Sequence, residues 1–214
     1  MKRKILICSL LLSGVIYFQA GAQKTSHYNL ARLLNKNKIL ATPLSKTSVL
    51  INDMPGAIST VNTVWFKSIH FTEGTIDIDL RGKNEFLKSF LGIVFHGADT
   101  GRFDVLYFRP FNFRHADTAR HRWSVQYMSL PDYDFSKLRK EHPLVYENSV
   151  NPVPAPDEWF HATIVIKGND LTVYVNHSPN PSLEVHLLNN RHDGMFGLFS
   201  DGLRSDFANL SIEL

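Results

Sequence analysis

The chain has 214 residues, with 23 basic and 20 acidic side chains, one cysteine and 12% aromatic residues. Three of the basic residues and none of the acidic ones lie within residues 1–22, so residues 23–214 carry 20 of each. A chain balanced in this way lacks the basic surplus of nucleic-acid-binding proteins, and we expect no nucleic-acid partner.

Residues 1–22 have the pattern of a secretory signal peptide. Basic residues at 2–4 precede an apolar run from 5 to 18, and small residues at 20–22 come just before Gln23. The apolar run is shorter than the roughly 20 residues of a membrane-spanning helix, which favours cleavage over a membrane anchor. We therefore expect an exported protein, periplasmic or secreted, with no membrane insertion after the signal is removed.

The cysteine, Cys8, would leave with the signal peptide. The mature chain would then have no disulfide, no thiol nucleophile and no thiolate metal ligand. Residues 23–214 suit a single domain that is large enough to bury a sizeable core.

Most of the chain alternates apolar and polar residues, or has short apolar runs between Gly, Asn, Asp and Pro, as β-strands do. Short helices are expected within 29–36 and at 135–140. The expected strands are, in chain order, 48–52, 62–68, 74–82, 90–97, 102–110, 121–129, 159–168, 171–177, 182–188, 194–200 and 206–214. Many short strands with close turns predict an all-β fold, a two-sheet antiparallel jelly-roll sandwich.

Residues 130–158 interrupt this rhythm and hold five of the ten prolines. Proline fixes the backbone and removes a hydrogen-bond donor, so the segment is expected to be rigid and to pack around the domain. A long irregular insertion in a compact domain is either functional or a packed cover. Two interpretations stay open: the segment covers a sheet edge, or it forms one wall of a binding site.

Three successive strands each present one apolar face and one mixed face, because alternate residues of a strand point to opposite sides. If the strands pair as a meander, His96, Tyr107, Arg109 and Gln126 share one surface, with Ser124 beside them. A guanidinium fork, a carboxamide and a phenol suit a sugar or a carboxylate. In the alternative interpretation Arg109 pairs with a local acid, Glu147 or Asp104, and only fixes a loop, while His96 is a structural histidine.

Several segments resemble the concanavalin A-like lectin/glucanase superfamily, nearest to its bacterial laminin-G-like branch and to the 3-keto-disaccharide hydrolase-like domains. The resemblance covers residues 55–214, and its sharpest parts are Trp159 opening a strand, Val173-Tyr174-Val175-Asn176, Gly194-x-x-Gly197-Leu198 and Phe207-Ala208-Asn209-Leu210. It implies a jelly roll of two curved sheets that binds carbohydrate on its concave sheet or at the rim loops.

The sequence lacks the signature motifs of these families. Glucanases of the superfamily carry Glu-x-Asp-x-x-Glu on one strand, and no such triplet occurs here. The nearest acidic alternation, Asp77 and Asp79, lacks both glutamates. The "NSG" strand signature of the keto-disaccharide hydrolase-like domains is replaced by "FLGIVFHG", so their activity is not carried over.

The ten histidines do not form a recognisable metal-binding pattern. His115 and His121 are six residues apart in an expected turn rich in basic residues, which indicates a solvated loop. No metal ligand and no cofactor is assigned. Calcium is possible, with the loops at 52–56 and 200–206 as candidates, although turn formation also explains their composition.

The leading hypothesis is an exported domain that binds an oligo- or polysaccharide on its concave sheet. The candidate binding residues are Tyr107, Arg109, Asn112, Gln126 and Tyr146. A second hypothesis is an enzyme that cleaves the glycosidic bond of an oxidised sugar, with His96 or Glu147 as the acid or base. A third is a structural or protein-binding module without a sugar site.

Overall fold

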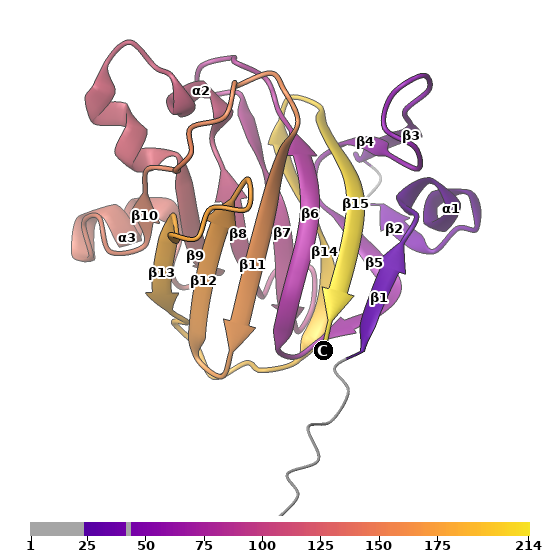
Figure 1. The fold of residues 1–214 in the computed structure, drawn as a ribbon. Helices are drawn as coiled ribbons and strands as arrows, with labels where there is room; N and C mark the ends of the chain where they lie inside the picture. Colours follow the sequence, from indigo (N-terminus) through magenta and orange to yellow (C-terminus); the bar gives the residue numbers. More distant parts are fainter. Residues whose placement is uncertain (1–23, 42–43) are drawn as a thin grey trace, which may run out of the picture.

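The structure is a computed structural model that describes residues 24–41 and 44–214. The expected signal peptide and Cys8 lie outside the described residues. In the described part of the chain, no helix has the length and apolar character needed to cross a membrane. The chain folds into two antiparallel sheets that face each other, which confirms the all-β jelly-roll sandwich expected from the sequence (Figure 1).

The first sheet has eight strands, all paired antiparallel. Its order is β13 (Leu183–His186), β12 (Asp170–Val175), β11 (Phe160–Lys167), β6 (Gly74–Arg81), β15 (Ser205–Glu213), β4 (Ile58–Val61) and β3 (Lys46–Val49), with β1 (Thr25–Tyr28) also paired to β15.

The second sheet has seven strands and is also antiparallel throughout. Its order is β10 (Glu147–Asn148), β9 (Val125–Leu130), β8 (Phe103–Phe108), β7 (Ser89–Gly97), β14 (Gly194–Gly202), β5 (Val64–Phe71) and β2 (Ile39–Ala41). The three strands β7, β8 and β9 pair in sequence, which confirms the expected meander.

Within residues 24–41 and 44–214, four short helical segments lie outside the sheets: α1 (Leu30–Asn35), α2 (Pro110–Phe113), the 3₁₀ helix η1 (Thr118–Trp123) and α3 (Phe135–Glu141). The expected helices at 29–36 and 135–140 are confirmed. The sequence pattern does not predict α2, which begins at Pro110 because proline suits the first turn of a helix. The strand expected at 121–129 begins only at Val125, since η1 occupies the residues before Ser124.

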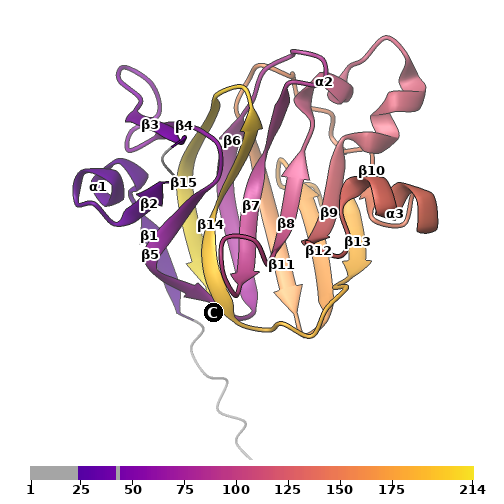
Figure 2. The ribbon, with the colours of Figure 1, turned by 180° about the vertical axis from the view of Figure 1, so that it is seen from behind.

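Strand β8 is buried along its whole length, which requires packing on both of its faces. Its inward residues Leu106 and Phe108 join the main core between the sheets. Its outward residues join a second hydrophobic cluster, here called the outer cluster, made of Trp65, Val94, Phe103, Val105, Tyr107, Met128 and Leu138. Leu138 belongs to α3, which lies beside β9 and β10 at this end of the seven-stranded sheet (Figure 2).

A glycine shapes the outer surface of this sheet. Gly92 pairs with Tyr107 on one side and with Phe199 on the other. A Cβ atom at position 92 would lie 2.0 Å from the carbonyl oxygen of Leu106. Without a side chain here, the rings of Tyr107 and Phe199 meet across the glycine, with centroids 5.4 Å apart. These two rings form the floor of the cavity described next.

Candidate functional site

The candidate site begins with two adjacent side chains on neighbouring strands. Tyr107 of β8 and Gln126 of β9 are directly opposite in register. The Tyr107 hydroxyl donates a hydrogen bond to Gln126 Oε1 at 2.7 Å. Burial raises the pKa of Tyr107 to about 12, so the phenol stays a neutral hydrogen-bond donor at physiological pH.

Arg109 follows β8 directly, and its guanidinium is buried. It donates through Nη2 to the Tyr107 hydroxyl and to Gln126 Oε1, and through Nη1 to the carbonyl oxygen of Trp123 at 2.9 Å. Its Cζ also lies 4.7 Å from the centre of the Tyr107 ring. The arginine, tyrosine and glutamine therefore form one connected network on the outer face of the sheet, as the strand alternation predicts.

Glu147 completes the network from β10, which pairs with β9 so that Glu147 lies opposite Gln126. Its Oε2 is 3.6 Å from Arg109 Nη1. Arg139 of α3 binds the same carboxylate from the other side, with Nε 3.0 Å from Oε1 and Nη2 2.9 Å from Oε2. One buried carboxylate thus lies between two guanidinium groups, which agrees with the alternative interpretation that Arg109 pairs with Glu147. Asp104, the other acid considered, lies on the inner face of β8.

Asn112 and Tyr146 lie near this network but do not line the cavity beside it. Asn112 is buried in α2, and its Nδ2 donates to the Trp123 carbonyl oxygen that also accepts from Arg109. Tyr146 packs against Tyr127 and His142 at the edge of the sandwich. Both residues support the local structure.

His96 lies on the opposite side of the sheet, so the expectation that it shares a surface with Arg109 is wrong. Between the positions that pair with Gly197 and Met195, β7 has one more residue than β14, and His96 has a φ of 48°. This bulge reverses the alternation of side chains after Val94. The imidazole stacks on Phe71 inside the main core, with ring centres 5.9 Å apart.

The surroundings of His96 are those of a structural histidine. Its Nε2 donates to the carbonyl oxygen of Thr72 at 2.5 Å, and its Nδ1 is 3.8 Å from Asp104 Oδ2. Burial lowers the pKa of His96 and raises that of Asp104. Asp104 in turn accepts hydrogen bonds from Tyr127 and Asn189.

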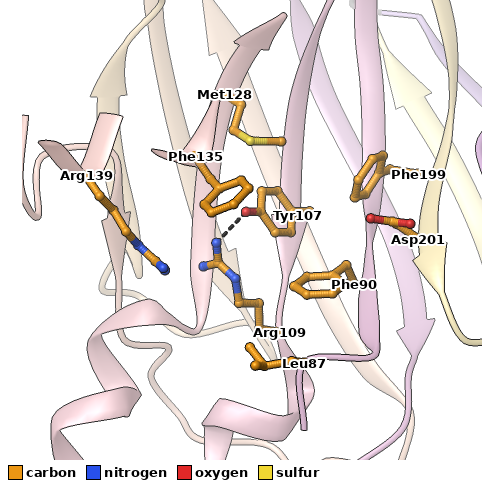
Figure 3. A pocket seen from close by; sticks show the side chains of 9 residues that line it. All are labelled: Leu87, Phe90, Tyr107, Arg109, Met128, Phe135, Arg139, Phe199 and Asp201. Carbon is orange, nitrogen blue, oxygen red and sulfur yellow. Dashed lines mark hydrogen bonds between the residues drawn. The ribbon is translucent and has the colours of Figure 1, made fainter. Parts of the chain in front are cut away.

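A cavity of about 190 Å³, here called the outer pocket, opens beside the network (Figure 3). Its lining residues are Leu87, Phe90, Tyr107, Arg109, Met128, Phe135, Arg139, Phe199 and Asp201. The aromatic side chains lie between the two arginines and Asp201 (Figure 3). The outer pocket therefore combines an apolar, aromatic interior with cations at one end and a carboxylate at the other.

Helix α3 belongs to the proline-rich segment and forms one wall of the outer pocket. This position supports the interpretation that the segment forms one wall of a binding site. Phe135 and Arg139 are four residues apart and both line the cavity, because residues at this spacing share one face of a helix. Asp134 caps the helix by accepting a hydrogen bond from the Lys137 amide at 2.8 Å. Leu138 anchors the helix in the outer cluster.

A second polar cluster lies on the outer face of the eight-stranded sheet. His161 is hydrogen-bonded through Nδ1 to Asp79 at 2.7 Å and through Nε2 to Asp77 at 3.1 Å. These hydrogen bonds to Asp77 and Asp79 raise the pKa of His161 to about 9, so the ring is an imidazolium ion at neutral pH. The His177 ring stacks on it at 4.2 Å. The two aspartates noted in the sequence thus neutralise a histidine on this outer face.

In the described part of the chain, no group of three or more His, Asp or Glu side chains is arranged to hold a metal ion. In the candidate calcium loops, the carboxylates of Asp53 and Asp206 both bind Arg81, at 2.7 and 2.8 Å. Asp53 also accepts a hydrogen bond from Trp159. Calcium binding at these loops stays a prediction.

Comparison with known proteins shows similarity at the level of the fold. No family model and no curated protein matches the sequence. Among solved structures, a protein of unknown function with a galectin-like fold from Bacillus subtilis superposes with a TM-score of 0.58 and 10% identity, covering 90% of this chain and 96% of the other. The carbohydrate-binding module CBM66 from Bacillus subtilis superposes with a TM-score of 0.54 and 13% identity, covering 78% and 91%.

These two likenesses, together with the antiparallel two-sheet topology, decide the fold. The fold is a concanavalin A-like jelly roll. Within this concanavalin A-like frame, the outer pocket lies on strands β7, β8, β9 and β14 and is closed on one side by α3.

The buried network predicts that Arg109→Met destabilises the fold by about 3 kcal/mol, the low end of the range for breaking a buried ion pair. The loss of stability is limited because the Glu147 carboxylate stays paired with Arg139, and the Trp123 carbonyl oxygen still accepts a hydrogen bond from Asn112. Urea unfolding measures the change. Arg102→Met is the matched control, since its ion pair with Asp99 is exposed and contributes at most about 1 kcal/mol. Equal effects of the two substitutions would contradict a structural role for Arg109.

The His161 cluster predicts a stability that falls in alkaline solution. A folded-state pKa of about 9, above the ordinary 6.5, means that the imidazolium stabilises the fold fully below about pH 6.5. This contribution is lost as the pH rises through 9, with a slope of at most about 1.4 kcal/mol per pH unit.

Urea unfolding from pH 6 to pH 10 should show this slope in the wild type and not in His161→Gln. His186→Gln is the control, because the His186–Asp170 pair is exposed. A wild-type profile parallel to that of His161→Gln would show that the cluster does not hold the histidine charged.

Proposed function

We propose that the protein is an exported carbohydrate-binding domain whose saccharide site is the outer pocket. The observation that carries this proposal is the combination of an aromatic floor with a fixed guanidinium pair in one small cavity. The rings of Tyr107 and Phe199 can pack against the C–H face of a sugar, while guanidinium N–H groups donate to its oxygens. Asp201 can accept hydrogen bonds from hydroxyl groups.

The size of the outer pocket supports a small ligand group. Its volume of about 190 Å³ is below the roughly 300–1,000 Å³ of cavities that enclose drug-sized ligands. One sugar ring fits this scale, with the rest of an oligosaccharide outside. The fold is also that of CBM66, which is described as a carbohydrate-binding module.

The arrangement of carboxylates favours binding over hydrolysis. Glycosidases use two carboxyl groups on either side of the scissile bond. Among the described residues, Asp201 is the one carboxylate that lines the outer pocket. Both oxygens of Glu147 accept hydrogen bonds from Arg139, and His96 lies in the core. Neither candidate acid or base of the enzyme hypothesis is therefore placed to act on a ligand in this pocket.

Saccharide binding predicts measurable affinity on a glycan array, followed by calorimetry with the best ligand. Phe199→Ala should weaken binding about 2- to 12-fold, the range expected when one aromatic contact is lost. Phe86→Ala is the matched control, because Phe86 packs on Phe111 outside the pocket lining. Absence of binding by the wild type would refute the proposal and favour a structural or protein-binding module.

Export is the second part of the proposal. The first described strand, β1, begins at Thr25, two residues after the predicted cleavage point before Gln23. Expression with the native leader in a bacterial host should yield a periplasmic or secreted protein whose intact mass corresponds to residues 23–214. A mass that retains residues 1–22 would show that the leader is not cleaved, and its recovery in the membrane fraction would indicate an anchor.

A further inference from the structure

The outer pocket has unused hydrogen-bond donors at its cationic end. Arg139 uses Nε and Nη2 on Glu147, and no residue of the described chain accepts a hydrogen bond from its Nη1. Arg109 uses both terminal nitrogens, while its Nε has no acceptor among the described residues. Both side chains line the pocket, and the tip of Arg139 reaches toward Arg109 (Figure 3).

The same end of the pocket carries an excess of positive charge. Two guanidinium groups share Glu147, which lies behind them and does not line the cavity. Burial lowers the pKa of Arg109, and the neighbouring charge of Arg139 lowers it as well. A second anion at this end would relieve the repulsion between the two cations.

The opposite end of the pocket determines the orientation of a bound ligand. Asp201 is an exposed carboxylate on β14, across the aromatic residues from the two arginines (Figure 3). It attracts hydroxyl groups and repels a negative charge. A ligand with one carboxylate and several hydroxyls can therefore satisfy both ends in a single orientation.

We propose that the ligand is an acidic saccharide, of the uronic acid type, whose carboxylate binds Arg139 Nη1 and Arg109 Nε while its hydroxyls donate to Asp201. This inference rests on the proposed function and adds the chemical class of the sugar. A planar carboxylate matches the geometry of guanidinium N–H groups, and such charge-assisted hydrogen bonds are about twice as strong as neutral ones.

Paired ligands test the inference. Oligosaccharides of galacturonic, glucuronic and mannuronic acid are compared by calorimetry with the same oligosaccharides after reduction of the carboxyl groups to alcohols. In at least one pair the acidic member should bind at least tenfold more tightly at low salt. The preference should shrink as salt is added, because the site is open to solvent.

Two variants test which residues cause the preference for the acidic oligosaccharide. Arg139→Gln should weaken the acidic member more than the neutral member and so abolish the advantage of the acidic one, because the charge-assisted hydrogen bond is the stronger of the two that are lost. Asp201→Asn, a change on the exposed rim, should strengthen acidic binding and weaken neutral binding. Arg102→Gln is the control for a remote arginine and should change neither affinity. Circular dichroism checks that each variant is folded.

The outcomes separate the two proposals. If the neutral member of every pair binds as tightly as the acidic one, the inference is overturned while saccharide binding stands. If no member of any pair binds and the glycan array is also blank, the proposed function fails and the inference fails with it. An acidic preference that survives in Arg139→Gln and is unchanged in Asp201→Asn would place the carboxylate elsewhere and overturn the inference.

Discussion

The buried guanidinium of Arg109 is the constraint around which this end of the molecule is built. A charge taken out of water is tolerated only when hydrogen-bonding partners surround it. The partners here come from three strands and the 3₁₀ helix η1: Tyr107 of β8, Gln126 of β9, Glu147 of β10 and the carbonyl of Trp123 in η1. Because each partner is held in a fixed position, the network determines how the edge of the seven-stranded sheet and the proline-rich segment meet.

The hydrophobic cluster on the outer face follows from the same arrangement. The salt bridge between Arg139 and Glu147 and the buried Leu138 hold α3 against the outer face of the sheet. This cover explains why β8 is apolar on both faces, although a strand with one solvated face would alternate. The cover stops short of β14, and the gap over Gly92 leaves Tyr107 and Phe199 as the floor of the outer pocket. The cavity is thus a consequence of how the cover is attached.

Sequence alone could predict the two-sheet fold and the core of the network, because both depend on local alternation. The outward positions of Tyr107, Arg109 and Gln126 follow from a period of two along β8 and β9. The alternation does not predict the position of His96, because a bulge has no signature in the apolar pattern of β7 and reverses the face of each residue after it. The sequence pattern does not predict the short strands β1, β2, β4 and β10, since two to four residues are too few to show a period.

The rest of the pocket lining depends on packing between distant segments. Phe199 meets Tyr107 only because β14 pairs with β7 in one particular register. Arg139 and Phe135 reach the pocket only because α3 lies over the sheet. The spacing of these two residues in the expected helix at 135–140 was the one signal that could have indicated a shared face. The sequence indicates Glu147 as a candidate but not its second partner, Arg139.

The central claim is that a saccharide binds on the outer face of the seven-stranded sheet, in the pocket beside Arg109. The most direct measurement is a titration of ¹⁵N-labelled protein with the best glycan, followed through the backbone amide signals and the Nε–H signals of the arginine side chains. The account predicts saturable shifts at Tyr107, Met128, Arg139 and Phe199. Shifts confined to His161 and Asn209, on the opposite face of the sandwich, would contradict it.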